Sequence, residues 1–308
     1  SGYQAPNSSH YPQGMVSCLY QLHAKLPWDF DLVEHANERQ CVPPLLKSLK
    51  EGDVVVYDRG YFSLWLFFHH VKNGIHAIFR LSESTCKPIE DFMQSGETDA
   101  IVSIEPGRDA KRRAAEAHPG IELESVKIRL IKYTVAETTY VLGTTLLEPR
   151  YDADTFPDAY HSRWGIEELY KVSKQIIGVE EFHAKTLRGV KQELYAHFVL
   201  ITMNRIFANH TDSPDSPMGS RESNSHSAQD AATIAQANFK NCVSAFVRNI
   251  EALFLEKAQG LKQTVASLIA RVRHRRQKAR PNRSFPRISM KPVGKWKPGK
   301  IIRTALAA

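Results

Sequence analysis

The most informative stretch of this chain is Asp158-Ala-Tyr-His-Ser-Arg-Trp-Gly-Ile-Glu-Glu-Leu-Tyr-Lys-Val-Ser-Lys-Gln-Ile-Ile177. Pro157 separates it from the preceding chain, Asp158 suits an N-cap, and the interior is rich in helix formers, so the stretch predicts one helix. At 3.6 residues per turn, four polar side chains fall within about 60° of arc and form one stripe. They are Tyr160, Arg163, Glu167 and Lys174.

The opposite face of this predicted helix is apolar and carries Leu169, Val172 and Ile176. The helix is therefore expected to bury one side and to present the polar stripe on the other. A carboxylate can bind a metal ion, and arginine, lysine and tyrosine bind phosphate oxygens. The stripe suits a metal and a phosphodiester backbone, although a solvated charged face has the same spacing.

A second candidate lies upstream, where Val54-Val-Val-Tyr57 is followed by Asp58. The β-branched run predicts a strand buried on both faces. Ligands of open α/β sheets gather at the carboxyl ends of strands, so Asp58 is placed as a metal ligand would be. The alternative is a turn or cap aspartate before Gly60.

The spacing Tyr160-x2-Arg163-x3-Glu167-x6-Lys174 resembles the Y-x2-R-x3-E-x6-K signature of DDE-class insertion-sequence transposases, specifically the insertion-sequence-four family. The segment from Asp53 to Ser63 is similar to that family's second-aspartate segment. The resemblance covers about residues 10–210, and the order of the two motifs agrees with it.

The resemblance implies an α/β fold with a ribonuclease-H-like catalytic core, a mixed sheet with helices that a β-rich insertion interrupts and C-terminal helices follow. It implies that Asp58 and Glu167 are catalytic metal ligands. Their oxygen donors suit Mg²⁺, with Mn²⁺ as a substitute. We expect the complete site to hold two such ions about 3.5–4 Å apart. The residues expected to contact DNA are Tyr160, Arg163, Lys174 and Arg59.

The first aspartate of the family pattern has no counterpart here. It belongs on the first core strand, well upstream of the second aspartate, yet only 57 residues precede Asp58 and the chain begins at Ser1. Asp29 and Asp31 lie too close to Asp58 and fit a later strand, where a role in solubility is expected. The sequence therefore resembles a transposase truncated at its N-terminus.

Five segments are expected along the chain. They are the N-terminal part of the core without its first strand (1–82), a β-rich insertion (83–150), the C-terminal part of the core with the glutamate helix (151–210), a polar linker (211–228), and a helical region with a basic tail (229–308). Within the insertion, the basic residues of 107–113 suit either a DNA-gripping loop or a solvated one.

Charge is concentrated at the C-terminal end. Residues 271–308 hold 13 of the 41 Lys and Arg and no Asp or Glu, which leaves a net charge of −5 on residues 1–270. A basic block of this kind favours a polyanion, most commonly nucleic acid. No apolar run reaches the ~18–20 residues that cross a bilayer, and no signal peptide is visible. The four scattered cysteines fit reduced thiols in the bacterial cytoplasm.

The resemblance implies a DNA transposase that performs metal-dependent cleavage and strand transfer at insertion-sequence ends. Its partners would be double-stranded DNA, both transposon end and target, and a second copy in a synaptic complex, with no membrane. Three alternatives stay open: a catalytically defective truncated protein that binds DNA or inhibits an intact transposase, a nuclease of the same fold that does not transpose, and a non-functional remnant.

Overall fold

The computed structural model describes most of the chain between Gly14 and Lys278. The described residues are 14–33, 37–82, 85–117, 120–135, 137–174, 178, 180–212, 235–255 and 257–278. Residues 213–228 of the expected polar linker and the basic tail from residue 279 lie outside the described residues. Thr211 and Asp212 belong to a helix.

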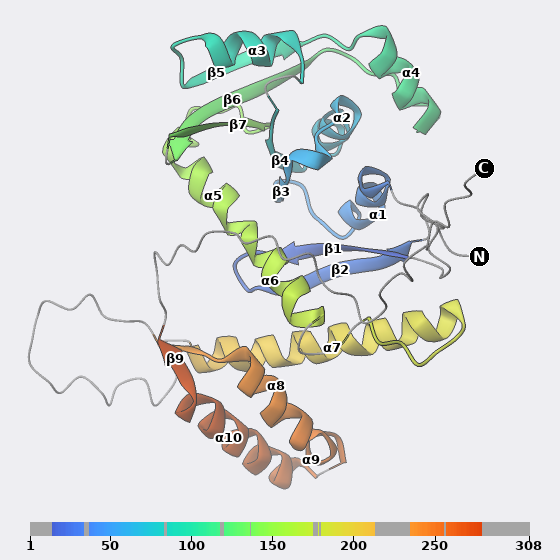
Figure 1. The fold of residues 1–308 in the computed structure, drawn as a ribbon, viewed down its shortest axis with the longest axis vertical. Coiled ribbons are helices and arrows are strands. Elements are labelled where there is room, and N and C mark those ends of the chain that lie inside the picture. The colour runs from blue at the N-terminus through green and yellow to red at the C-terminus, as the bar shows by residue number, and fades with distance from the viewer. Residues whose placement is uncertain are drawn as a thin grey trace, which may run out of the picture.

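Five strands form one mixed sheet in the order β3-β4-β7-β6-β5 (Figure 1). They are β3 (Val54–Tyr57), β4 (His76–Arg80), β5 (Asp99–Ile104), β6 (Val126–Val135) and β7 (Thr138–Thr144). Only β3 and β4 are parallel, and the other neighbours are antiparallel. Strands from both sides of residue 83 thus share one sheet. This mixed α/β arrangement fits a ribonuclease-H-like core, whereas the segment boundaries stay a prediction.

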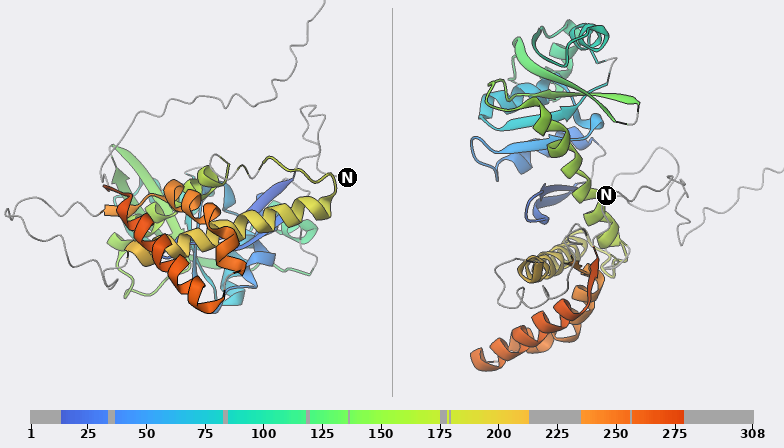
Figure 2. Two further views of the ribbon diagram at one scale, coloured as in Figure 1. Left: turned by 90° about the horizontal axis from the view of Figure 1, so that it is seen from below. Right: turned by 90° about the vertical axis from the view of Figure 1, so that its left-hand side faces the viewer.

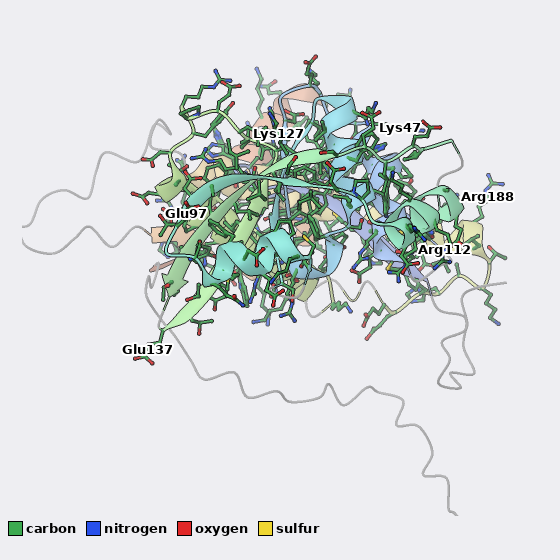
Figure 3. All side chains as sticks on the ribbon, turned by 90° about the horizontal axis from the view of Figure 1, so that it is seen from above. Lys47, Glu97, Arg112, Lys127, Glu137 and Arg188 are labelled. Atoms are coloured by element: carbon green, nitrogen blue, oxygen red, sulfur yellow. The ribbon has the colours of Figure 1, made fainter. Side chains whose placement is uncertain are left out.

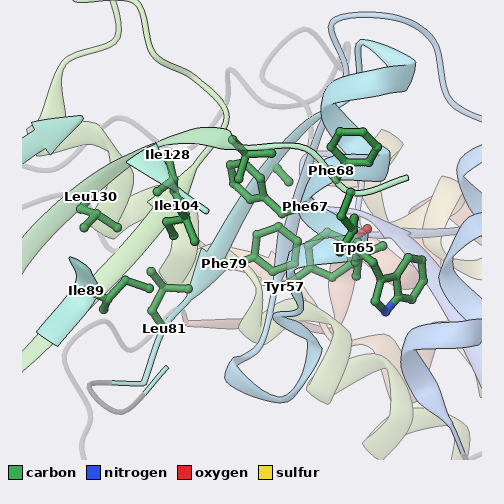
Figure 4. Packing of buried hydrophobic residues seen from close by; sticks show 14 of the residues in the cluster. Tyr57, Trp65, Phe67, Phe68, Phe79, Leu81, Ile89, Ile104, Ile128 and Leu130 are labelled. Carbon is green, nitrogen blue, oxygen red and sulfur yellow. The ribbon is translucent and has the colours of Figure 1, made fainter. Parts of the chain in front are cut away.

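One face of this sheet holds the largest core. Alternate residues of the strands, such as Phe79 on β4 and Ile128 on β6, pack there against four helices (Figure 4). The helices are α1 (Val42–Leu46), α2 (Leu64–Asn73), α3 (Lys87–Gln94) and α4 (Arg108–Ala117). Helix α2 supplies the crossover that a parallel strand pair needs, and it ends at Gly74 with φ of 65°, as the sequence predicts.

The opposite face of the sheet is covered by α5 (Phe156–Ser162). Ile78, Ile131 and Leu142 point to this side and enclose Phe156, which is 2% exposed. Val56 of β3 packs against the same cluster. Because side chains alternate along a strand, Asp58, two residues after Val56, is directed toward the side of the sheet that α5 covers.

The hairpin of β1 (Met15–Gln21) and β2 (Leu26–Val33) forms a second, separate sheet. It lies between the five-stranded sheet and the long helix α7 (Leu187–Asp212), as both views show (Figures 1 and 2). Phe30 and Leu32 pack toward α7, and Asp31 also reaches this helix through its ion pair with Lys191. Within the described residues, β1 and β3 are each paired along one edge only.

The C-terminal part packs on the second half of α7. Helices α8 (Phe239–Arg248), α9 (Ile250–Leu255) and α10 (Ala258–His274) follow in order, with a short β8–β9 pair of Ala235–Ala237 and Arg276–Lys278. Phe246 and Leu268 are the centre of their shared core with α7. Three helices and two short strands thus lie within the segment 229–308, whose assignment as a helical region with a basic tail stays a prediction.

Residues 108–117 differ from the sequence prediction, because the expected basic loop is helix α4. Ala114 is fully buried against the main core, and Arg112 bonds Asp109 and Glu116 one turn away on either side. Arg112 thus lies on the outer surface of α4, far from Glu137 at the tip of the β6–β7 hairpin (Figure 3). None of the helices in the described part is long and apolar enough to cross a membrane.

Candidate active site

The predicted glutamate helix divides at Arg163 into α5 and α6 (Trp164–Val172). The amide of Arg163 bonds the carbonyl of Tyr160, and the amide of Ile166 bonds the carbonyl of Arg163, both at 3.1 Å. These i→i+3 bonds tighten the chain at one residue without ending its helical course. The N-cap prediction was wrong, because α5 starts before Asp158.

Three of the four stripe residues still meet. Arg163 donates from Nη2 to Oε1 of Glu167 at 2.9 Å, and its guanidinium lies 5.7 Å from the centre of the Tyr160 ring. The Arg163 side chain is 17% exposed and that of Glu167 is 42% exposed. The junction thus directs the carboxylate toward solvent and keeps the arginine mostly enclosed.

Asp58 lies at the carboxyl end of β3, as predicted, and its carboxylate accepts a 2.6 Å bond from the amide of Arg59. It caps the short turn Arg59–Tyr61, so the cap and the candidate ligand are the same residue. Burial works against the charge of Arg163, but the bond to Glu167 and the charges of groups that include Asp58 raise the pKa of Arg163. Arg163 is therefore bonded to one of the two predicted carboxylates and is influenced by the charge of the other.

Two polar atoms in this group are buried without a hydrogen-bond partner in the described part of the chain: the Tyr160 hydroxyl and Nε of Arg163. An unpaired buried donor costs about 1–3 kcal/mol, so such atoms are usually hydrogen-bonded to a ligand or to water. Both residue types bind phosphate oxygens. The junction thus leaves two buried donors without a partner next to the Glu167 carboxylate.

Lys174 and Arg59 lie at the margins of this arrangement. Lys174 Nζ bonds Glu180 Oε1 at 2.7 Å, and its side chain is half exposed. Arg59 is exposed next to Asp58. Among the described residues, neither cation bonds to Tyr160, Arg163 or Glu167, so their predicted DNA-binding roles stay predictions.

The family model described as "Transposase DDE domain" matches residues 1–203 of the chain. The chain belongs to this family. It is also 25% identical over 193 residues to "Transposase InsG for insertion sequence element IS4" of Escherichia coli (strain K12), a match that covers 62% of this chain and 42% of that protein. The chain thus spans about two-fifths of the length of this curated relative.

DDE transposases generally use divalent metal ions, and the residues present fit such an ion in part. Asp58 and Glu167 offer exposed carboxylate oxygens, and Mg²⁺ in proteins often takes one or two carboxylates together with substrate oxygens and water. The described ranges contain no group of three His, Cys, Asp or Glu side chains able to hold a metal. The roles of Asp58 and Glu167 as metal ligands therefore stay a prediction.

A third carboxylate, that of Glu38, lies near Asp58 without joining the pair. It lines an open cavity of about 440 Å³ together with Asn37, Arg39 and Gly60. Burial, and secondarily the charge and hydrogen bond of Glu38, raise the pKa of Tyr61. Glu38 is thus hydrogen-bonded to Tyr61. No pattern in the sequence predicts the position of Glu38 in the fold.

Sequence reasoning also missed Arg80, which ends β4 one residue beyond the Tyr57–Phe79 pair. Its guanidinium lies 4.7 Å from the centre of the Tyr140 ring, and Tyr140 stacks on Tyr133. Alternation directs Arg80 to the α5 side of the sheet, as it does Asp58. The signal that could have found it is the register of two adjacent parallel strands, whose carboxyl ends meet at one edge.

Proposed function

We propose that this chain carries the catalytic site of a transposase that cleaves DNA at insertion-sequence ends and joins those ends to a target. The observation that carries the proposal is the bond of 2.9 Å between Arg163 and Glu167, beside the unpaired hydroxyl of Tyr160, in a chain of the transposase family. Asp58, at the end of β3, supplies the second carboxylate of the proposal. Carboxylates together with an arginine suit phosphoryl transfer.

In this proposal Asp58 and Glu167 hold a divalent ion, with Mg²⁺ preferred and Mn²⁺ a substitute. When bound, the ion supplies Lewis-acid activation of the scissile phosphodiester. A third carboxylate from outside the described residues completes the ligand set. The unpaired edges of β1 and β3 support a further strand as its source.

The other residues bind and orient the DNA backbone. Arg163 offers a planar, permanently charged donor set that matches two phosphate oxygens, and its buried Nε is free for one of them. The Tyr160 hydroxyl donates to a neighbouring oxygen. Arg80 and Lys174 extend the positive surface to either side, and Arg59 supports the Asp58 end.

When phosphate enters, Arg163 exchanges its bond to Glu167 for bonds to DNA. Because Glu167 then loses a partner, its oxygens become available to the ion at the moment substrate arrives. The segment 83–150 acts in this proposal as the β-rich insertion, and two copies pair the ends in a synaptic complex.

The test is a cleavage and joining assay with the purified chain, Mg²⁺, and duplex DNA carrying the ends that flank its coding sequence. We expect metal-dependent nicking and 3′-end joining that the Asp58→Asn chain lacks. Nicking without joining would favour a nuclease of the same fold instead. Metal-dependent nicking that persists unchanged in Asp58→Asn would overturn the assignment of this site.

A second candidate function is supported by the pair, rather than triad, of carboxylates in the described residues. A chain with two of three ligands would bind ends without cutting them and would inhibit an intact transposase. Binding of end DNA with no nicking at any Mg²⁺ concentration would favour this candidate over the first. Absence of both binding and nicking would contradict both.

A further inference from the structure

Arg129 of β6 is a buried cation that the proposed chemistry does not use. It is 6% exposed and lies on the same face of β6 as Ile131, the face that α5 covers. Nε and Nη2 donate to the two carboxylate oxygens of Asp99 at 2.9 and 2.6 Å. This bidentate pair joins β6 to the start of β5 and neutralises the buried charge.

The remaining donors of Arg129 hold the segment that leads into the site. Nη1 bonds the backbone carbonyls of Tyr151 at 2.8 Å and Glu148 at 3.2 Å. The guanidinium also lies 5.5 Å from the ring centre of Phe156, in the first turn of α5. One side chain thus fixes three points between the end of β7 and the glutamate helices.

The placement of α5 depends on few other polar contacts. Phe156 packs on the sheet through Ile131 and Leu142, and Ala159 and Tyr160 continue the same cluster. Apolar packing is non-directional, so it allows a helix to slide or turn along its axis. Directed bonds from a rigid guanidinium to two carbonyls set the axial position.

We propose that Arg129, anchored by Asp99, is a positioning residue that sets the place of Tyr160, Arg163 and Glu167 opposite Asp58. The inference rests on the proposed function for its catalytic consequence. Its structural consequence, a fixed α5, stands independently. Arg129 touches no residue of the candidate site except through the segment it holds.

The test variant is Arg129→Lys in the full chain. Lysine keeps the charge beside Asp99, but one ammonium cannot also reach both carbonyls and the Phe156 ring. The matched control is Lys132→Met. Lys132 bonds the carbonyls of Phe92, Met93 and Ser95 at the end of α3, so it performs the same task for a helix away from the site.

Hydrogen exchange is the first measurement, because it does not depend on activity. We expect amides of α5 and the Arg163 turn to exchange about tenfold faster in Arg129→Lys, with α3 unchanged, and the reverse pattern in Lys132→Met. Equal exchange of α5 in Arg129→Lys and the wild-type chain would overturn the proposal. Faster exchange everywhere would also overturn it, because it would mean general destabilisation.

The second measurement separates positioning from loss of folded protein. In Arg129→Lys we expect DNA cleavage to fall about 10–100-fold while the Kd for end DNA stays within about threefold. Equal losses of binding and cleavage would contradict positioning. If the wild-type chain does not cleave, the proposed function fails, and the exchange data alone still decide whether Arg129 fixes α5.

Discussion

Arg163 bonds Glu167 across one helical turn at 2.9 Å while Asp58, from the distant strand β3, adds to the field that keeps it charged. Glu167 is held by a direct bond to this arginine, whereas Asp58 acts on Arg163 through its charge alone. The same contact makes Arg163 a competitor of any ion for Glu167.

Glu167→Gln is expected to remove cleavage and keep end binding. The amide still accepts a hydrogen bond from Arg163, so the local geometry persists, but it is a poor ligand for a hard cation. Loss of several kcal/mol of charge stabilisation corresponds to a rate decrease of roughly 10³-fold. The measurement compares nicking rates and DNA affinity for the two chains.

Glu168→Gln is the matched control for this change, because Glu168 is the exposed neighbour on the same helix. Cleavage there should stay within about twofold of wild type, as expected for an ordinary surface substitution. If Glu167→Gln cleaves as well as Glu168→Gln, Glu167 is not a metal ligand.

Lys174→Ala is expected to weaken DNA binding and to flatten its salt dependence by ~1 phosphate equivalent. In the free chain Lys174 is bonded to Glu180 at 2.7 Å, so DNA must displace this partner. Glu180→Gln should therefore strengthen binding modestly. Titrations of end DNA at several salt concentrations give both slopes, and identical slopes for Lys174→Ala and wild type would exclude a phosphate contact.

The sequence predicts the elements around Asp58 well because their signals are local. A β-branched run makes β3, although the predicted burial on both faces was wrong, because β3 is an edge strand and Val54 is 45% exposed. Gly74 ends α2 in the left-handed conformation that glycine favours. The stripe of the glutamate helix is also local, since i,i+3 and i,i+4 spacing survives the tightening at Arg163. Local spacing thus brings Tyr160, Arg163 and Glu167 together, whereas the functional roles of these residues and of Asp58 rest on the family resemblance and stay predictions.

The missed features depend on partners far along the chain. The bonds of Arg129 to Asp99, 30 residues away, and to two carbonyls beyond β7 form only in the folded chain. The basic residues of α4 suggest a loop, although burial of Ala114 stabilises a helix there. Strand pairing determines which groups surround Arg80, and no single segment encodes strand order.

Gly165→Ala is expected to destabilise the chain, because a Cβ at this position would lie 2.8 Å from Cε1 of the Tyr20 ring. The ring belongs to β1 and packs in the hairpin cluster, so it cannot move away freely. Overpacking costs about 1–3 kcal/mol, offset by up to about 1 kcal/mol from the better helix propensity of alanine. Urea unfolding measures the net loss.

The control for this prediction is Gly96→Ala, where an added Cβ meets nothing within 4 Å. The double variant Tyr20→Ala/Gly165→Ala should show a favourable coupling of about 1 kcal/mol or more, because the clash is absent. Strict additivity of the two changes would mean that Gly165 and Tyr20 do not interfere.

His70 is expected to make stability fall as pH is lowered from about 6.5 to 4. Its Nδ1–H donates to the Ile75 carbonyl at 3.0 Å, and Nε2 accepts from the Tyr57 hydroxyl at 2.8 Å, so the ring is neutral in the fold. Burial, with smaller effects from His69 and His76, lowers its pKa from 6.5 to about 4.

Because the folded pKa of His70 lies below the unfolded one, the unfolded chain binds the proton first as pH falls. The stabilisation is therefore complete above pH 6.5 and is lost progressively toward pH 4, by up to about 3 kcal/mol. Burial lowers the pKa of His197 in the same direction, so the informative quantity is a difference between variants. His70→Gln offers an amide donor and acceptor but does not titrate.

Urea unfolding from pH 7.5 to 4.5 measures the free energy of unfolding against pH. This free energy should depend less steeply on pH in His70→Gln than in wild type, and the control His161→Gln, at an exposed histidine, should match wild type. Parallel curves for His70→Gln and wild type would mean that the Tyr57–His70–Ile75 chain of hydrogen bonds tolerates a charged imidazole.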